Sequence, residues 1–110
     1  MKWDIRYHDE KLQAQVLALP AGILARYIHC TDRMVTFGPE LGMPHTRAMS
    51  GGLFELRLKS REGIARIFYC TVVDRKIIML HQFIKKTEKT PPKELRIARE
   101  RIKEWKHVDS

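Results

Sequence analysis

Polar and apolar residues alternate in two segments of the chain, which is the pattern of a β-strand with one buried face. In residues 2–7, Trp3, Ile5 and Tyr7 fall on one side and charged residues on the other. Residues 53–59 (LFELRLK) alternate in the same way between glycines and a polar turn. One face of this second strand has Phe54, Leu56 and Leu58, and the other has Leu53, Glu55, Arg57 and Lys59.

Two longer apolar segments follow and predict the middle of a sheet. Residues 64–73 (IARIFYCTVV) are apolar on both faces apart from Arg66, as expected of a central strand. Residues 76–83 are a further strand, and the short Asp74-Arg75 turn between them indicates an antiparallel hairpin.

Helical spacing appears in three places. Asp9 is a suitable cap for a helix that contains Leu12, Val16 and Leu19. Pro20 ends that helix and suits the first turn of a second one, whose apolar stripe runs to Met34. Residues 37–44 contain two glycines and two prolines, which predict a loop.

A third helix is predicted at the C-terminal end, after a polar and basic connection at residues 85–90. Thr90 is its expected N-cap and Pro91 its first helical residue. Its apolar stripe contains Leu95, Ala98, Ile102 and Trp105. The element order predicts one α+β domain over residues 1–110. In it, an N-terminal helical hairpin and a C-terminal helix pack on a twisted antiparallel sheet.

The charge of the chain is uneven, and this points to a polyanionic partner. The formal net charge is +8. Residues 1–50 have six basic and five acidic side chains, whereas residues 51–110 have fifteen and eight. Solubilising charge would be spread more evenly, so the second half is expected to meet the polyanion. The alternative interpretation is a solvated basic surface.

Several classes of protein are not indicated. Cys30 and Cys70 are far apart and fit two small, buried hydrophobic side chains. No zinc-ligand spacing, nucleotide-binding glycine motif or acyl-transfer signature occurs, so we expect neither a metal nor another cofactor. No apolar run reaches membrane-spanning length and the N-terminus has no export signal, which predicts a cytoplasmic protein.

The candidate chemistry lies in polar residues on strands that would otherwise be apolar. These residues are Glu55, Arg57, Lys59, Arg66, His81, Lys85 and Lys86. If the strands pair in sequence order, the residues can gather on one face and form a basic surface for an RNA backbone. RNA supplies its own nucleophile, since the 2′-hydroxyl can attack the adjacent phosphate. Arginine is a planar, bidentate phosphate ligand, and histidine or lysine can transfer protons.

Each of these residues also has a purely structural interpretation. Arg66 can pair with Glu55 in a salt bridge that only stabilises the fold. His81 can be a hydrogen-bonded core histidine, and Lys85 and Lys86 can be a solvated end of a strand.

Four segments together resemble a known family. They are residues 53–57 (LFELR), 63–69 (GIARIFY), 77–87 (IIMLHQFIKKT) and 89–91 (KTP). They are similar to the core of HigB-like members of the RelE/ParE toxin superfamily. The phage-derived branch has the pattern LxELR…GxxRxxY…xLLHxFxKKTxKTP followed by a helix. The close similarity covers about residues 50–105.

The resemblance implies metal-free, usually ribosome-dependent cleavage of mRNA by the toxin of a type II toxin–antitoxin system. It also implies a neighbouring antitoxin, in this branch usually a helix-turn-helix protein. The family's two strand arginines correspond to Arg57 and Arg66. Its C-terminal catalytic or RNA-contacting positions fall at or after His81. Some relatives have a tyrosine and a histidine there. This chain has residues 83–86 (FIKK) instead, so a lysine is the first choice of general acid and His81 the second.

The sequence therefore predicts an mRNA endoribonuclease whose catalytic residues are Arg57, Arg66, His81, Lys85 and Lys86. Lys59, Arg61 and Lys89 are expected to bind RNA, and Glu55 to act as a base or an orienting group. Two alternatives remain open at this stage. One is a ParE-like inhibitor that binds DNA gyrase, and the other is a non-catalytic RNA-binding module.

Overall fold

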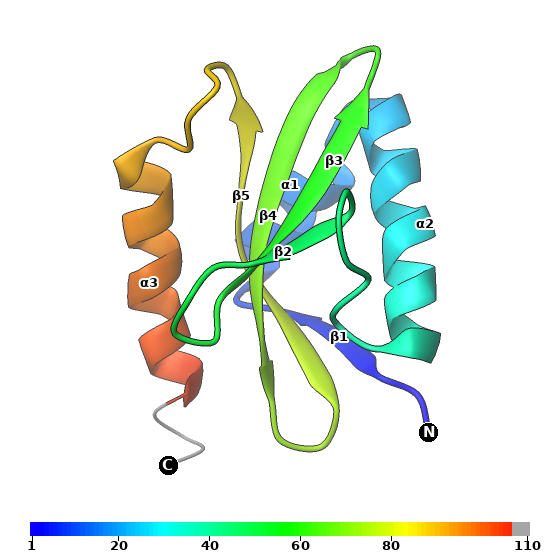
Figure 1. The fold of residues 1–110 in the computed structure, drawn as a ribbon, viewed down its shortest axis with the longest axis vertical. Coiled ribbons are helices and arrows are strands. Elements are labelled where there is room, and N and C mark those ends of the chain that lie inside the picture. Colours follow the sequence, from blue (N-terminus) through cyan, green and yellow to red (C-terminus); the bar gives the residue numbers. More distant parts are fainter. Residues whose placement is uncertain (107–110) are drawn as a thin grey trace.

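Five strands form one sheet in the computed structural model, which describes residues 1–106 (Figure 1). In chain order they are β1 (Asp4–Tyr7), β2 (Thr46–Ala48), β3 (Phe54–Ser60), β4 (Gly63–Val72) and β5 (Lys76–Lys85). Their order across the sheet is β1-β5-β4-β3-β2. The three long strands pair antiparallel in sequence order, as the alternating pattern and the short turns predicted.

Two features of the sheet differ from the prediction of an antiparallel sheet. β1 lies parallel to β5, with Ile5 opposite Ile77, so the sheet is mixed. The alternating pattern of β1 shows which face is buried but contains no information about the direction of the neighbouring strand. β2 was not predicted, because three residues are too few to show a period. It pairs antiparallel with the first residues of β3.

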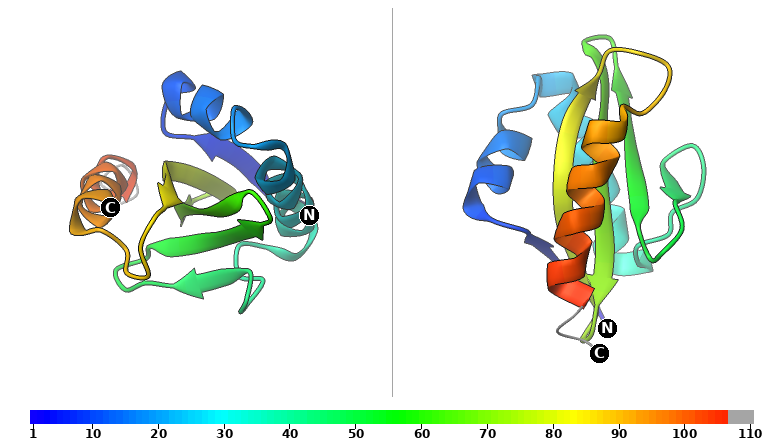
Figure 2. Two further views of the ribbon diagram at one scale, coloured as in Figure 1. Left: turned by 90° about the horizontal axis from the view of Figure 1, so that it is seen from above. Right: turned by 90° about the vertical axis from the view of Figure 1, so that its left-hand side faces the viewer.

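The three helices cover the two faces of the sheet, as Figure 2 shows. α1 (Glu10–Leu17) and α2 (Ala21–Phe37) lie against one face and α3 (Pro92–Lys106) against the other. The Asp9 side chain accepts a hydrogen bond from the backbone of Leu12 and caps α1, as predicted. α3 begins at Pro92, one residue later than the predicted start, and the carbonyl of Pro91 accepts from Glu94 and Leu95.

Each face of the sheet has its own apolar core. Leu56, Leu58, Ile67 and Tyr69 point toward α1 and α2. Leu53, Phe68, Ile78 and Leu80 point toward α3 and pack against its buried residues Ala98 and Ile102. Because side chains alternate along a strand, Glu55, Arg57 and Arg66 must lie on the α3 face of the sheet. The register is thus fixed by the cores, and it sets the position of the charged residues.

In the described residues 1–106, no helix combines the length and the apolar character that a membrane crossing requires. Together the elements make one α+β domain.

The docking of α3 can be tested at Ile102, whose side chain is buried between the helix and the sheet. Replacing a buried isoleucine with alanine removes apolar contacts and leaves a cavity, which typically costs about 2–5 kcal/mol. We therefore expect Ile102→Ala to lower the free energy of unfolding by about this amount, measured by urea denaturation. Val73→Ala is the control, because Val73 is 61% exposed and should change stability little.

Candidate functional site

Arg57 on β3 and Arg66 on β4 stand directly opposite each other across the antiparallel strand pair. Like charges in this position repel, at a cost of about 0.2–1 kcal/mol relative to an uncharged pair. Neither residue can turn to the other face without moving Leu56, Leu58 and Ile67 out of the core. The fold therefore holds two guanidinium groups close together in a fixed place.

A buried carboxylate lies beside the two arginines and partly neutralises them. The Glu55 side chain is only 2% exposed. Its Oε1 accepts a hydrogen bond from Nη1 of Arg57 at 3.0 Å, and the same oxygen is 3.8 Å from Nε of Arg66. One carboxylate thus serves two cations, and only the contact with Arg57 is close enough for a hydrogen bond.

Arg66 is the less satisfied of the two arginines. Its side chain is 6% exposed, and its Nη1 donates to the carbonyl of Ala65 at 3.2 Å. Its Nε is buried and has no hydrogen-bond partner among the described residues. Burial lowers the pKa of Arg66, and the charge of Arg57 lowers it further, while Glu55 raises it. A buried donor without a partner is costly, and an anion placed here would supply one.

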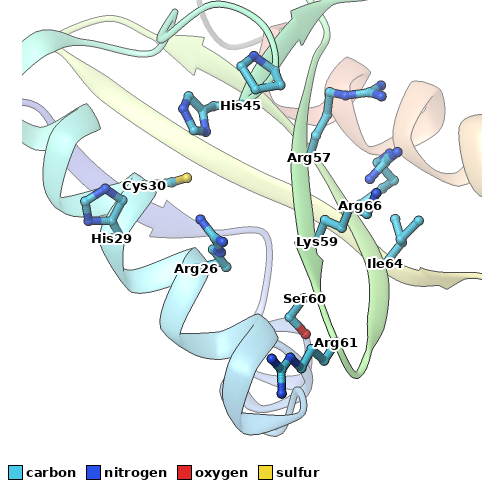
Figure 3. A pocket seen from close by; sticks show the side chains of 11 residues that line it. Arg26, His29, Cys30, His45, Arg57, Lys59, Ser60, Arg61, Ile64 and Arg66 are labelled. Atoms are coloured by element: carbon cyan, nitrogen blue, oxygen red, sulfur yellow. The ribbon is translucent and has the colours of Figure 1, made fainter.

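The arginine pair opens into a groove of about 730 Å³ that follows the edge of β3 (Figure 3). The groove is lined by Arg26, His29, Cys30, Pro44, His45, Arg57, Lys59, Ser60, Arg61, Ile64 and Arg66. Five of these side chains are lysine or arginine, two are histidine, and none is acidic. This lining favours an anionic ligand.

The groove exists because β2 is short. β2 pairs only with Phe54–Leu56, and one further hydrogen bond joins the backbone N–H of Arg57 to the carbonyl of His45. Beyond that point β3 has no neighbour on this side. Figure 3 shows Arg57 and Arg66 on one side of the strand and Arg26, Cys30 and His45 on the side of α2. The two groups of side chains meet around the free edge of β3.

Lys85 ends the strand that lies next to the strand of Arg66, and Lys86 follows it. Lys85 is the register partner of Ile64, which is two residues from Arg66 on the same face. Ile64 also lines a second hollow of about 410 Å³, together with Lys85, Lys86, Thr87 and Glu88. The two hollows therefore share Ile64 as a common wall, and Lys85 and Arg66 lie on the same face of the sheet.

The other predicted residues are divided between the groove and other places. Lys59 and Arg61 line the groove. Lys89 is exposed in the connection to α3 and lines neither hollow. His81 is on the α3 face but outside the groove, and its Nε2 is 3.0 Å from Oε1 of Glu94 on α3. This partner ties His81 to the helix, which agrees with the structural interpretation of that histidine.

Three arginine or histidine side chains that line the groove were not predicted from the sequence. Arg26 and His29 come from α2, and His45 from the loop before β2. The apolar stripe of α2 predicts the helix but not which of its polar side chains face β3. The spacing of Arg26, His29 and Arg33 along the helix was the signal that could have found the basic stripe.

Among residues 1–106, no three histidine, cysteine or acidic side chains gather in a way that could hold a metal ion.

Comparison with known proteins gives one result. Residues 14–103 match the family described as phage derived protein Gp49-like (DUF891). This range includes α2, the groove strands and most of α3. Among proteins with curated functions, none matches the chain.

Replacing Arg66 can decide whether this residue stabilises the fold or is kept for binding. We expect Arg66→Met to raise the free energy of unfolding by about 1 kcal/mol, measured by urea denaturation. The substitution removes a buried donor without a partner and the repulsion with Arg57, while Glu55 keeps its closer partner.

Arg57→Met is the matched comparison. It removes the hydrogen bond that Glu55 accepts from Arg57 and should lower the free energy of unfolding. A lower stability of Arg66→Met would instead identify the Glu55–Arg66 contact as a structural salt bridge.

Proposed function

We propose that this chain, which belongs to the phage-derived Gp49-like family, is the toxin of a toxin–antitoxin pair and acts by cutting RNA. The family is toxin-like and related to the RelE and HigB toxins. Cleavage of mRNA on the ribosome, and a helix-turn-helix antitoxin encoded nearby, are the specific forms of the proposal. They are supported by the family relationship and by the basic groove.

One observation supports the nuclease activity more than any other. Arg57 and Arg66 face each other over a single buried carboxylate, in a groove without an acidic lining residue. The two guanidinium groups repel each other, and a bound anion would reduce this repulsion. The pair is therefore suited to binding a group that gains negative charge during a reaction. A phosphodiester under attack is such a group, because its pentacoordinate state has one more negative charge.

The proposed reaction uses the 2′-hydroxyl of the RNA as the nucleophile. A base removes its proton, the 2′-oxygen forms a bond to phosphorus, and the bond from phosphorus to the 5′-oxygen breaks. An acid then protonates the departing 5′-oxygen. The products are a 2′,3′-cyclic phosphate, which can open to a 3′-phosphate, and a 5′-hydroxyl. Arg57 and Arg66 would donate to the phosphate oxygens, with Nε of Arg66 as an available donor.

Proton transfer is assigned first to Lys85 and Lys86. The proposal is supported by the second hollow, which both lysines line and which shares Ile64 with the groove. His81 is the second choice, because Glu94 already engages its Nε2. Glu55 is better suited to orienting the arginines than to acting as a base, since it is buried and accepts from Arg57. Lys59 and Arg61 would contact neighbouring phosphates, and Lys89 is a more distant RNA contact.

Cleavage of a ribosome-bound message tests this assignment. We expect Arg66→Met to lower the cleavage rate about 10²–10³-fold, because one donor to a developing oxyanion is worth that much. Lys86→Ala should also slow cleavage, by about 10²–10⁴-fold if Lys86 transfers a proton. The products should accept a 5′-phosphate from a polynucleotide kinase without prior dephosphorylation.

Arg96→Ala is the control, since Arg96 is exposed on α3 and lines neither hollow. Equal cleavage by the wild type, Arg66→Met and Lys86→Ala would remove the proposed site. Expression that leaves messages intact but causes DNA-damage filamentation would favour the gyrase-inhibitor alternative. Toxicity that needs no cleavage would favour the RNA-binding module.

A further inference from the structure

A basic stripe runs along α2 beside the groove. Arg26, His29 and Arg33 have the spacing i, i+3 and i+7, which places them on one face of the helix. Cys30 lies between them. Burial raises the pKa of its thiol, and the charges of Arg33 and Arg26 lower it, so both guanidinium groups are near this residue.

The two arginines of the stripe have no counter-charge in the part of the chain that the structure describes. Among residues 1–106, neither Arg26 nor Arg33 forms an ion pair or a side-chain hydrogen bond. Other arginines do have partners: Arg6 binds Asp4, and Arg99 binds Ser50. The positive charge of the stripe is therefore available to a ligand.

Arg26 and His29 of the stripe line the same groove as the arginine pair, and Arg33 lies one turn further along α2, outside the lining. Arg26, His29 and His45 line it from the side of α2, and Arg57 and Arg66 from the other side of β3 (Figure 3). The backbone hydrogen bond between Arg57 and His45 joins the two sides at 2.8 Å. A long polyanion that is held at Arg66 can thus continue around the edge of β3 to α2.

We propose that the α2 stripe binds the phosphates next to the scissile one, so that the RNA strand crosses the free edge of β3. The inference rests on the proposed function and adds a second binding site to it. The ligand is the backbone of single-stranded RNA, recognised by charge and not by base identity.

An RNA backbone fits this surface better than a protein partner does. Protein interfaces are centred on apolar and aromatic side chains. The lining of this groove contains no phenylalanine, tyrosine or tryptophan, and its cations outnumber its apolar residues. The buried Nε of Arg66, which has no partner, also points to an anion at one end of the groove.

The experiment measures the salt dependence of RNA binding. The probe is a 2′-O-methyl RNA of about 12 nucleotides, which cannot be cleaved and is long enough for a groove of this kind. For single strands, the slope of log K against log salt changes by about 0.7 for each phosphate contact. We expect Arg26→Gln to reduce the slope by about 0.7, and the Arg26→Gln/Arg33→Gln pair to reduce it by about twice that value.

Arg96→Gln is the matched control, because it removes the same charge from the exposed face of α3 and should leave the slope unchanged. A second readout separates binding from chemistry. In cleavage of a ribosome-bound message, Arg26→Gln should raise KM and leave kcat unchanged, whereas Arg66→Met should lower kcat. If Arg26 only stabilised the fold, Arg26→Gln would lower RNA binding, cleavage and the free energy of unfolding together.

The outcomes distinguish this inference from the proposed function. If Arg26→Gln and Arg96→Gln give the same slope while Arg66→Met still abolishes cleavage, the α2 site is wrong and the nuclease proposal stands. If the wild type binds the RNA without salt dependence, the α2 site is also wrong. If Arg66→Met cleaves like the wild type, the nuclease site is wrong, and the α2 site falls with it.

Discussion

The register of β3 against β4 places Arg57 opposite Arg66, and the features of the groove depend on this pairing. It is fixed by apolar residues on the other face, since a shift by one residue would expose Leu56, Leu58 and Ile67 to water. The hydrophobic core therefore determines the separation of two charged groups that it never contacts. A loop could not hold them so firmly against their own repulsion.

The charged centre has a cost in stability, which we attribute to the proposed binding of an anion. Three polar side chains occupy positions on the α3 face that apolar residues could fill. Glu55 is buried to neutralise the arginines, and one nitrogen of Arg66 still has no partner. Native proteins keep such unsatisfied groups where a ligand completes them. In this chain the unsatisfied donor lines the same groove as the exposed cations, which is why we interpret it as one end of a binding site.

The sequence predicted those helices and strands in which apolar residues recur at a regular spacing. The segment LFELRLK gave the faces of β3, and Arg66 stood out because it interrupts an apolar strand. The direction of β1 could not be predicted, because alternation is the same in parallel and antiparallel pairs. β2 was missed because it is too short, and the α2 side of the groove because contacts between α2 and β3 are tertiary. The position of His81 beside Glu94 likewise depends on how α3 docks.

The unpaired edge of β3 has a consequence for how copies of this protein meet. An open strand edge is a template on which a second chain can add a strand and begin to aggregate. Here the edge is surrounded by Arg26, Lys59 and Arg61. If two copies met at this edge, their positive charges would repel each other. A polyanion is attracted to this edge, and a second copy of the chain is repelled from it. The feature that admits the proposed ligand thus also keeps the molecules apart.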